Sequence, residues 1–338
     1  MSTYIQGLGL SLPGLPVTNS MLSQKFGINS DWVSLYLKNN SRYFATDLNS
    51  GEEMMSLKDI SYSAAIDAIN NAKINIEQID FIIMATATPD KLMPATVNEI
   101  AFDLGLLGIP TFQLQSGCSG AIQAIYLAHE LLSQEKYKYG LIIGADTCNK
   151  FIDPIKNYNE TKPSEIINYA LFGDGAGALI LSSERNNNVL EVESVNYKIL
   201  NKKYDSGQIV NWNGIKENSK EMLMEDYKSI ENNVPNITKE ELLYILENTK
   251  KNIDQIDWFL FPQLSGKMTD KIIADINVDY EKTINCVKET GNNGNALLIF
   301  QLSGLIGKIK PNESAIAITV ESSRWLSGSM FIKCKEGN

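Results

Sequence analysis

Arginine and histidine are scarce in this chain of 338 residues. Only three arginines, Arg42, Arg185 and Arg324, stand among its 30 basic residues, so bidentate guanidinium clamps for phosphate or carboxylate groups are nearly excluded. The single histidine, His129, excludes His-rich metal sites. We therefore expect neither a bound metal nor a resident cofactor.

An excess of positive charge and long apolar runs are also lacking. The formal net charge of −10 would repel nucleic acid and an acidic membrane surface. No apolar run approaches the roughly 18 residues that span a bilayer. The opening residues carry no basic segment followed by an apolar stretch, as a secretory signal would. We expect a cytoplasmic protein with no nucleic-acid or membrane partner.

Cysteine, proline and glycine are too few or too scattered for several other classes. The four cysteines, Cys118, Cys148, Cys286 and Cys334, form no CxxC pair, which favours reduced thiols over disulfides or zinc ligands. With 43% hydrophobic residues, 10 prolines and 23 glycines, disordered and collagen-like chains are excluded. The length suits a folded protein of two domains.

The chain contains an internal repeat. Residues 76–83 match residues 253–260, and each copy follows a stretch with helical apolar spacing and runs into a short apolar strand. A second match sets residues 116–121 opposite 290–295, each leading into a helical pattern. Buried strands then follow at 140–145 and 315–320, and strands containing glycine at 173–181 and 328–333.

The repeat predicts an α/β fold of two related halves, residues 1–185 and 186–338, with the boundary near the polar run 185–188. Continuous apolar strands that alternate with helices favour mixed, mainly parallel sheets covered on both faces. Two polar stretches, 150–165 and 204–226, interrupt the pattern. We expect them to be long excursions that cap a binding site.

Cys118 is the candidate nucleophile. The repeat gives Cys118 and Asn292 equivalent places at turns between a strand and a helix N-terminus, and a pseudo-twofold axis would bring the turns together. The helix dipole and unpaired amides would favour thiolate over thiol, so the nucleophile would need no strong base. Gly117 and Gly120 permit close approach of a substrate carbonyl. The alternative is a small buried hydrophobic residue.

His129 and the glycines of 173–177 favour structural roles. His129 follows Cys118 by 11 residues on one expected helix, or roughly 16 Å, too far for it to be the partner base. We expect it on the helix surface or hydrogen-bonded within the core. The glycine run precedes a strand, whereas a dinucleotide fingerprint opens a helix, so we expect close packing.

With these features in place, the sequence resembles the thiolase superfamily, and within it the β-ketoacyl-acyl carrier protein synthase III group, over nearly the whole chain. The resemblance rests on four runs: Ala85-Thr86-Ala87-Thr88-Pro89-Asp90 with Met93-Pro94, Gly117-Cys118-Ser119-Gly120, Phe172-Gly173-Asp174-Gly175-Ala176-Gly177-Ala178, and Gly291-Asn292. It implies a five-layered thiolase-like fold, a homodimer, and a cysteine that accepts an acyl group from coenzyme A or a carrier protein. The acyl thioesters of coenzyme A and of the carrier protein would then be substrates and not cofactors.

The resemblance also assigns residues. Cys118 matches the nucleophile, and Asn292 matches the asparagine that holds the second substrate's thioester oxygen. Met93 matches a residue that reaches into the partner's acyl pocket, and Trp32 a tryptophan that stacks on the adenine of coenzyme A.

Two positions depart from the family pattern. Gln263 stands where relatives carry the catalytic histidine; it cannot exchange a proton, but its amide could donate to an oxyanion. Ser323 would supply the amide that completes the oxyanion hole with that of Cys118, in a turn that has lost glycines. We expect Arg324 or Trp325 to reshape the pocket there.

The resemblance implies an acyl-thioester on Cys118 and transfer of the acyl group, by decarboxylative condensation with a malonyl-type thioester, in fatty-acid or natural-product biosynthesis. A first alternative is an acyltransferase to an amine or hydroxyl; a hydroxyl would need a base, and the sequence identifies none. A second is a catalytically silent partner of an active paralogue.

Overall fold

The computed structural model describes residues 2–134, 136–150, 163–185, 190–200, 204–210 and 223–336. The helices are α1 (Asn19–Phe26), α2 (Ser30–Trp32), α3 (Leu57–Ala72), α4 (Thr96–Asp103), α5 (Gly120–Leu132), α6 (Pro163–Leu171), α7 (Tyr227–Thr249), α8 (Gly266–Ile276), α9 (Val287–Thr290) and α10 (Leu297–Ile306). The strands are β1 (Thr3–Ser11), β2 (Val17–Thr18), β3 (Ser41–Arg42), β4 (Phe81–Ala85), β5 (Thr111–Leu114), β6 (Tyr139–Thr147), β7 (Asp174–Ser182), β8 (Leu190–Ile199), β9 (Gln208–Val210), β10 (Leu223–Glu225), β11 (Trp258–Leu260), β12 (Ser314–Glu321) and β13 (Leu326–Cys334).

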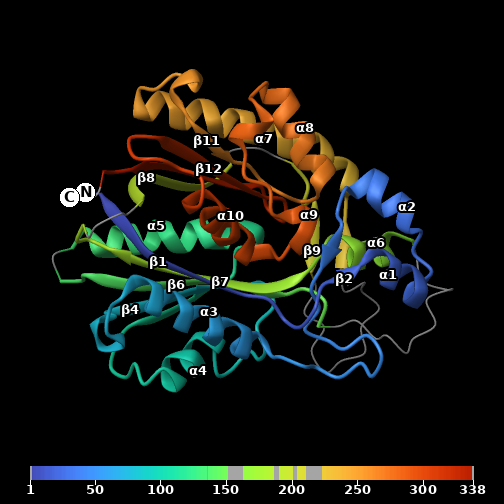
Figure 1. Cartoon of the computed structure of the whole chain (residues 1–338), viewed down its shortest axis with the longest axis horizontal. Helices are drawn as coiled ribbons and strands as arrows, with labels where there is room; N and C mark the ends of the chain where they lie inside the picture. The colour runs from blue at the N-terminus through green and yellow to red at the C-terminus, as the bar shows by residue number, and fades with distance from the viewer. Residues whose placement is uncertain are drawn as a thin grey trace.

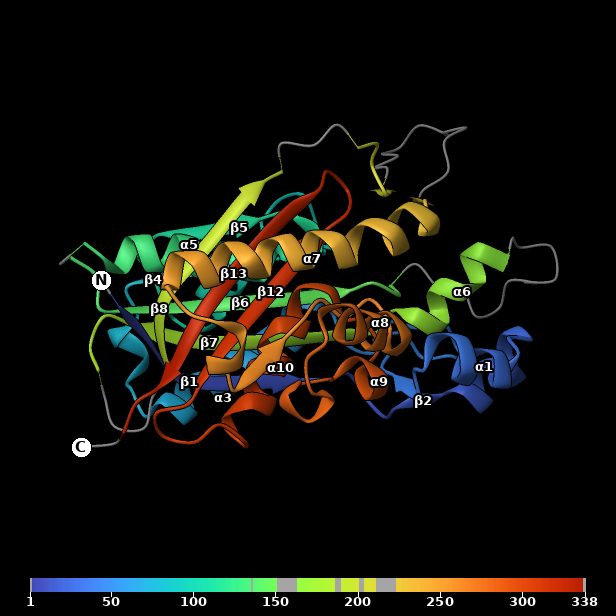
Figure 2. The ribbon, with the colours of Figure 1, turned by 90° about the horizontal axis from the view of Figure 1, so that it is seen from above.

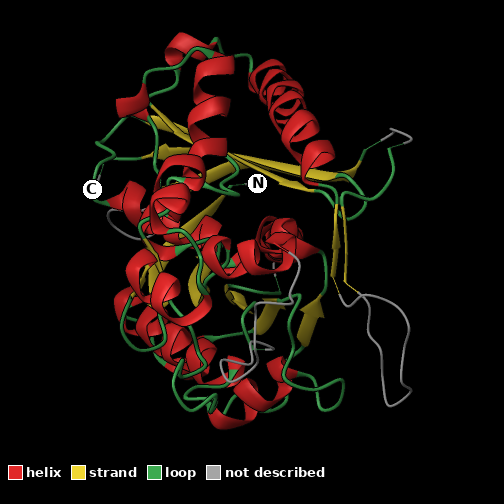
Figure 3. Cartoon of the chain, turned by 90° about the vertical axis from the view of Figure 1, so that its right-hand side faces the viewer, coloured by secondary structure: helices red, strands yellow, loops and turns green. Residues whose placement is uncertain are grey.

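Helices and strands alternate in five layers (Figure 1). Helices α3 and α4 cover β1, β7, β6 and β4 from outside; α5 and α10 lie in the middle; α7 and α8 cover β11, β12 and β13 from the opposite side. Figure 2 shows α7 crossing β12 and β13, and Figure 3 shows helices on both outer faces and between the strands. One apolar core lies under α3 and α4, another under α7 and α8, and a third joins α5 and α10 to the strands on both of their sides. The expected five-layered α/β architecture is confirmed.

The main sheet has the order β11-β12-β13-β8-β1-β7-β6-β4-β5. Among the described strands, β4–β5, β4–β6 and β11–β12 pair parallel, while the other five pairs are antiparallel. The sheet is mixed, as expected, but the expectation of mainly parallel pairing is wrong. Continuous apolar strands report burial on both faces, and burial does not fix the direction of the neighbouring strand.

The repeat is a real structural unit. Helices α3 and α7 each end at a lysine in the left-handed conformation, Lys73 with φ 56° and Lys250 with φ 54°. A 3₁₀ turn closed by a reciprocal Asn–Gln capping box follows in each, at Ile76–Gln78 and Ile253–Gln255, and then β4 or β11. The expected helix, turn and strand are confirmed.

The halves meet where β1 pairs with β8 over three residues. On one side of this junction the sheet contains strands from before residue 185, and on the other strands from after it. Residues 186–188 of the expected boundary lie outside the described residues, and the division into two domains stays a prediction. Among the helices that the structure describes, none combines the length and apolar character needed to traverse a bilayer.

Candidate active site

Cys118 lies in a 3₁₀ turn, Gly117–Ser119, between β5 and the N-terminus of α5. Gly117 has φ +57°, a conformation that glycine adopts without strain, and a Cβ there would collide with the Glu321 carboxylate. The turn with the same form in the other half is Gly294–Ala296, which opens α10. The expected strand, glycine turn and helix around Cys118 are therefore present.

The structural counterpart of Cys118 is Asn295, because both are the central residues of these two turns. The expected equivalence of Cys118 with Asn292 is therefore wrong by three residues. The sequence match at 116–121 and 290–295 followed the glycines, whereas the structure keeps the same spacing that relates Ile76–Gln78 to Ile253–Gln255.

A cavity of about 70 Å³ brings the candidate residues together. Its described wall contains Cys118, Asn292 and Gln263, with Glu321 beside them. The rest of the wall is mainly apolar and comes mostly from the second half: Phe172, Gln208, Glu225, Ile230, Val234, Pro262, Leu264, Gly294, Leu297, Leu298, Gln301, Ile318, Thr319, Val320 and Ser322. Cys118 of the first half thus faces a cavity built largely by the second half.

The two amides expected to form the oxyanion hole converge on one group. The Cys118 N–H donates to Oε2 of Glu321 at 2.5 Å, and the Ser323 N–H donates to Oε1 at 2.7 Å. The negative charge of this carboxylate also acts on the Cys118 thiol. Two donors aimed at a negatively charged oxygen are what a tetrahedral intermediate of acyl transfer requires. Here that place holds the side chain of Glu321.

Sequence reasoning missed Glu321. The available signal was a carboxylate directly after the apolar run of β12, at the end of a strand buried along its whole length. Charged side chains are seldom fully buried without partners, so a glutamate in that place indicates a specific set of donors.

The environment of Cys118 disfavours the thiolate. Burial raises the pKa of the thiol well above its usual value, and the negative charges of Glu321 and Asp146 raise it further. The expectation that the helix N-terminus alone would supply a thiolate is therefore wrong for this arrangement. Burial also raises the pKa of Glu321, although the Ser323 and Cys118 amides oppose this. Burial and these charges favour the protonated thiol of Cys118, and the Glu321 carboxylate lies next to this residue.

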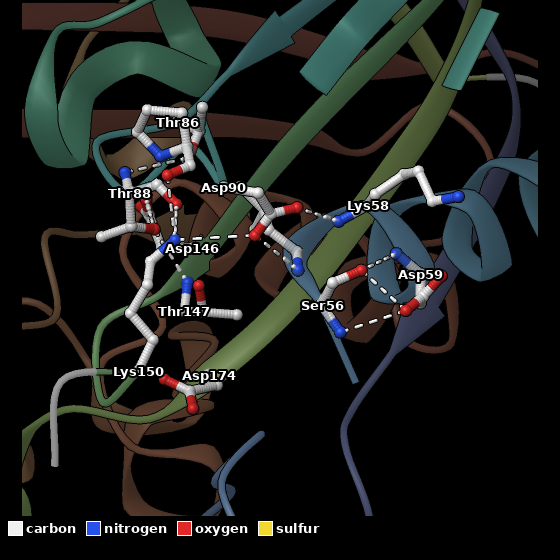
Figure 4. A network of polar contacts seen from close by, with 12 residues as sticks. Ser56, Lys58, Asp59, Thr86, Thr88, Asp90, Asp146, Thr147, Lys150 and Asp174 are labelled. Atoms are coloured by element: carbon white, nitrogen blue, oxygen red, sulfur yellow. Dashed lines mark hydrogen bonds and ion pairs between the residues drawn. The ribbon is translucent and has the colours of Figure 1, made fainter. Parts of the chain in front are cut away.

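Asp146, at the end of β6, occupies the place in the first half that Glu321 has in the second. Its Oδ2 accepts from the N and Nδ2 of Asn295, and its Oδ1 accepts from Thr86, Ala87 and Thr88. Figure 4 shows Thr86 and Thr88 directed at this carboxylate. Each half thus offers an acid to the turn of the other half.

The side-chain amide of Gln263 is hydrogen-bonded to backbone groups of the cavity wall. Its Oε1 accepts from the N–H groups of Cys286 and Val287 at 2.9 and 3.0 Å, and its Nε2 donates to the Ile284 carbonyl. Thus Gln263 lines the cavity, but the described hydrogen bonds of its carboxamide hold the backbone before α9. The expected orientation of this amide toward a thioester oxygen is not observed.

Asn292 is placed differently. It is 3% exposed, and its Oδ1 accepts from the Gly294 N–H at 3.1 Å. Because the oxygen is engaged, the amide nitrogen is the group that Asn292 can offer to a substrate oxygen in the cavity.

Trp32 and Met93 do not belong to the described wall of the cavity. The Trp32 ring stacks on Tyr36, with centroids 5.5 Å apart, near the surface. Met93 is 86% exposed. Their roles toward adenine and toward a partner's acyl pocket stay predictions.

Arg324 and Trp325 do not reshape the cavity as expected. Trp325 is 1% exposed, has φ 53° and donates its indole N–H to the Asp205 carbonyl. Arg324 is exposed. Neither belongs to the described wall, where Glu321 provides the altered chemistry instead.

The structural interpretations of His129 and of the glycine run are confirmed. Nδ1 of His129 forms a hydrogen bond with Thr3 Oγ1 at 3.0 Å, and burial lowers the pKa of the ring. Residues 174–182 form β7, where a Cβ at Gly177 would press on Ile299. Asp174 accepts from the backbone N–H groups of Ala45 and Asn149.

Part of the excursion at 204–226 reaches the cavity, since Gln208 and Glu225 line it. Residues 211–222 and most of the stretch 150–165 lie outside the described residues. All four cysteines are free.

Comparison with known proteins identifies relatives of this chain. The family model of 3-oxoacyl-(acyl-carrier-protein) synthase III matches residues 112–197, which include Cys118 and Asp174. A β-ketoacyl-(acyl-carrier-protein) synthase III of Rickettsia prowazekii (strain Madrid E) is 29% identical over 340 residues, 98% of this chain and 99% of the relative. One from Porphyra purpurea is 27% identical over 332 residues, 94% of each chain.

Solved structures agree. AbyA1, a tetronic acid condensing enzyme, is 33% identical, with a TM-score of 0.93 and coverage of 98% of this chain and 99% of that one. The synthase III of Pseudomonas aeruginosa PAO1 has a TM-score of 0.84 at 20% identity over both full chains, which shows the fold. With the cysteine turn, the paired amides and the five-layered architecture, these likenesses place the protein in the β-ketoacyl-acyl carrier protein synthase III family of the thiolase superfamily.

Proposed function

We propose that the protein is a condensing enzyme that takes an acyl group from coenzyme A or an acyl carrier protein onto Cys118 as a thioester. The observation that carries the proposal is the convergence of the Cys118 and Ser323 amides on the two oxygens of one carboxylate group next to Cys118. Such a pair stabilises the oxyanion formed when a thiol attacks a thioester. The apolar cavity wall suits an acyl chain.

The second half of the reaction is a decarboxylative condensation with a malonyl-type thioester of a carrier protein or coenzyme A. Loss of carbon dioxide leaves an enolate, whose oxygen needs hydrogen-bond donors and no proton acceptor. The amide nitrogen of Asn292 is the donor that supports this step. Trp32 would contact the adenine of coenzyme A, and Met93 would enter the partner's pocket in a homodimer.

Transfer to a hydroxyl acceptor is a second candidate, for which two observations speak. Glu321 places a carboxylate at the thiol, so a base is present that the sequence did not reveal. A tetronic acid condensing enzyme is also among the similar solved structures. An oxygen nucleophile attacking the acyl-Cys118 thioester would give up its proton to such a carboxylate.

The test incubates the purified protein with acyl-coenzyme A and acyl carrier protein of several chain lengths and measures intact mass. We expect one acyl adduct on the wild type and on Cys334→Ala, and none on Cys118→Ala. Adding a malonyl thioester should then release carbon dioxide and an elongated product, whereas a hydroxyl acceptor would yield an ester. Absence of an adduct at every chain length would overturn the proposal in favour of a silent partner of an active paralogue.

A further inference from the structure

The carboxylate of Glu321 competes with the reaction for the oxyanion hole. Its two oxygens take the Cys118 and Ser323 N–H groups, one each, and the residue is 2% exposed. A thioester oxygen cannot reach both donors while the Glu321 side chain holds them, because each N–H already donates to one of its oxygens. The hole must be vacated before acylation.

Glu321 is also the acidic group placed to take the thiol proton. Gln263 cannot accept a proton, and Asp146 accepts five hydrogen bonds and does not line the described cavity. Glu225 lines the cavity, but its Oε1 accepts from Gln208 at 2.6 Å. Asp146, Glu225, Tyr197 and Cys148 are described groups that interact electrostatically with Cys118 or Glu321. Within the described cavity, Glu321 is the acid that accepts a hydrogen bond from the backbone N–H of Cys118 itself.

We propose that Glu321 is the general base for Cys118, and that the proton it receives opens the oxyanion hole. This inference rests on the proposed acylation of Cys118. The S–H bond of Cys118 breaks as its proton bonds to a carboxylate oxygen, and Sγ forms a bond to the thioester carbon. The neutral carboxyl group is a weaker acceptor, so the Cys118 and Ser323 amides pass to the substrate oxyanion. When the intermediate collapses, the donor's C–S bond breaks, and the departing sulfur takes the proton back from Glu321.

The counterpart Asp146 shows what a purely structural acid looks like here. It accepts five hydrogen bonds and does not belong to the described cavity wall. Glu321, in contrast, accepts two backbone hydrogen bonds and borders the cavity. If Glu321 only held the two halves together, its removal would change the stability of the protein. The acylation rate and the alkylation rate of the Cys118 thiol would then change together.

The experiment compares two reactions of Cys118 in the wild type and Glu321→Gln, each across pH 5.5–9. Single-turnover acylation by an acyl-thioester, followed by intact mass, requires both a base and the hole. Alkylation by iodoacetamide requires only thiolate. We expect Glu321→Gln to slow acylation by about 10²–10³-fold, as loss of a general base does. Alkylation should become faster, because a negative charge beside the thiolate is gone.

Glu225→Gln is the matched control, since it removes a cavity charge that acts on Cys118 without removing an acceptor at the hole. Its two rates should rise together. Glu321→Asp keeps a carboxylate and should recover part of the acylation rate; it also serves if Glu321→Gln fails to fold. Parallel changes of both rates in the Glu321 variants would overturn the base role. A wild type that is alkylated on Cys118 but never acylated would instead overturn the proposed function, and this inference with it.

Discussion

At the scale of single residues, two side chains share the roles that the family pattern gives to one catalytic histidine. Gln263 has the structural role, and Glu321 carries the titratable group. The Gln263 side chain holds the Cys286 and Val287 amides and the Ile284 carbonyl, which are backbone groups of the cavity wall. Glu321 brings the titratable group, at the end of β12. The family pattern therefore predicts that residue 263 lies in the cavity wall. The hydrogen bonds indicate which side chain at the site can accept a proton.

Replacing Gln263 by alanine should destabilise the protein by about 2–4 kcal/mol. The change leaves the buried Cys286 and Val287 N–H groups without their acceptor and opens a small cavity. Urea unfolding of Gln263→Ala measures the effect, with the exposed Gln134→Ala as control, for which a change within about 0.5 kcal/mol is expected. Unchanged stability with lost activity would point instead to a catalytic amide.

The two 3₁₀ turns are the elements on which the site depends. Each begins with a glycine of positive φ, Gly117 at 57° and Gly294 at 56°, and each glycine faces an acid of the opposite half. A Cβ at Gly294 would collide with Asp146, as one at Gly117 would with Glu321. The absence of a side chain lets the central amide of each turn approach the carboxylate.

Gly117→Ala should be more damaging than backbone strain alone explains. Positive φ costs a non-glycine residue about 1–2 kcal/mol, and the new Cβ must also displace Glu321. Gly27→Ala is the matched control, because Gly27 has φ 69° and nothing within 4 Å of its Cβ position. Chemical denaturation should show a loss of about 1–2 kcal/mol for Gly27→Ala and a larger loss for Gly117→Ala. Equal losses would contradict the packing argument.

Side-chain hydrogen bonds also fix the N-terminus of helix α3 (Figure 4). Ser56 and Asp59 form a capping box, and Asp90 accepts from the N–H groups of Leu57 and Lys58. Lys150 lies 3.6 Å from Asp90 and donates to the Thr88 carbonyl at 2.5 Å. The run 85–90 that contributes to the family resemblance thus anchors the helix and, through Thr86 and Thr88, the acid Asp146.

At the scale of the whole molecule, three buried carboxyl groups lie at or near the junction of the halves. Burial raises the pKa of Asp146, Asp174 and Glu321, and that of Asp174 to about 7. A group with a raised pKa binds more protons folded than unfolded. Its contribution to stability is therefore present below the unfolded pKa and is lost as pH rises toward the folded value.

Asp174→Asn should remove this contribution. Between about pH 4 and 7, the unfolding free energy of the variant relative to the wild type should rise with pH, by up to about 1.4 kcal/mol per pH unit. Urea unfolding at several pH values measures the difference. Asp47→Asn is the control, because backbone N–H groups lower the pKa of that exposed acid, so the relative stability should stay flat above pH 4.5. A flat difference for Asp174→Asn would contradict the argument.

The sequence by itself determined the layered α/β fold, the helix, turn and strand units of both halves, and the place of Cys118 at a glycine turn before a helix. These follow from apolar periodicity, glycine positions and caps, which are local in the chain. Only the tertiary structure decided that most strand pairs in the sheet are antiparallel and that Asn295 is the structural counterpart of Cys118. It also decided which backbone groups are hydrogen-bonded to Gln263 and Glu321. Cys118 and Glu321 are 203 residues apart. Which acid meets which amide depends on how the two halves pack, and no local pattern in the sequence carries that information.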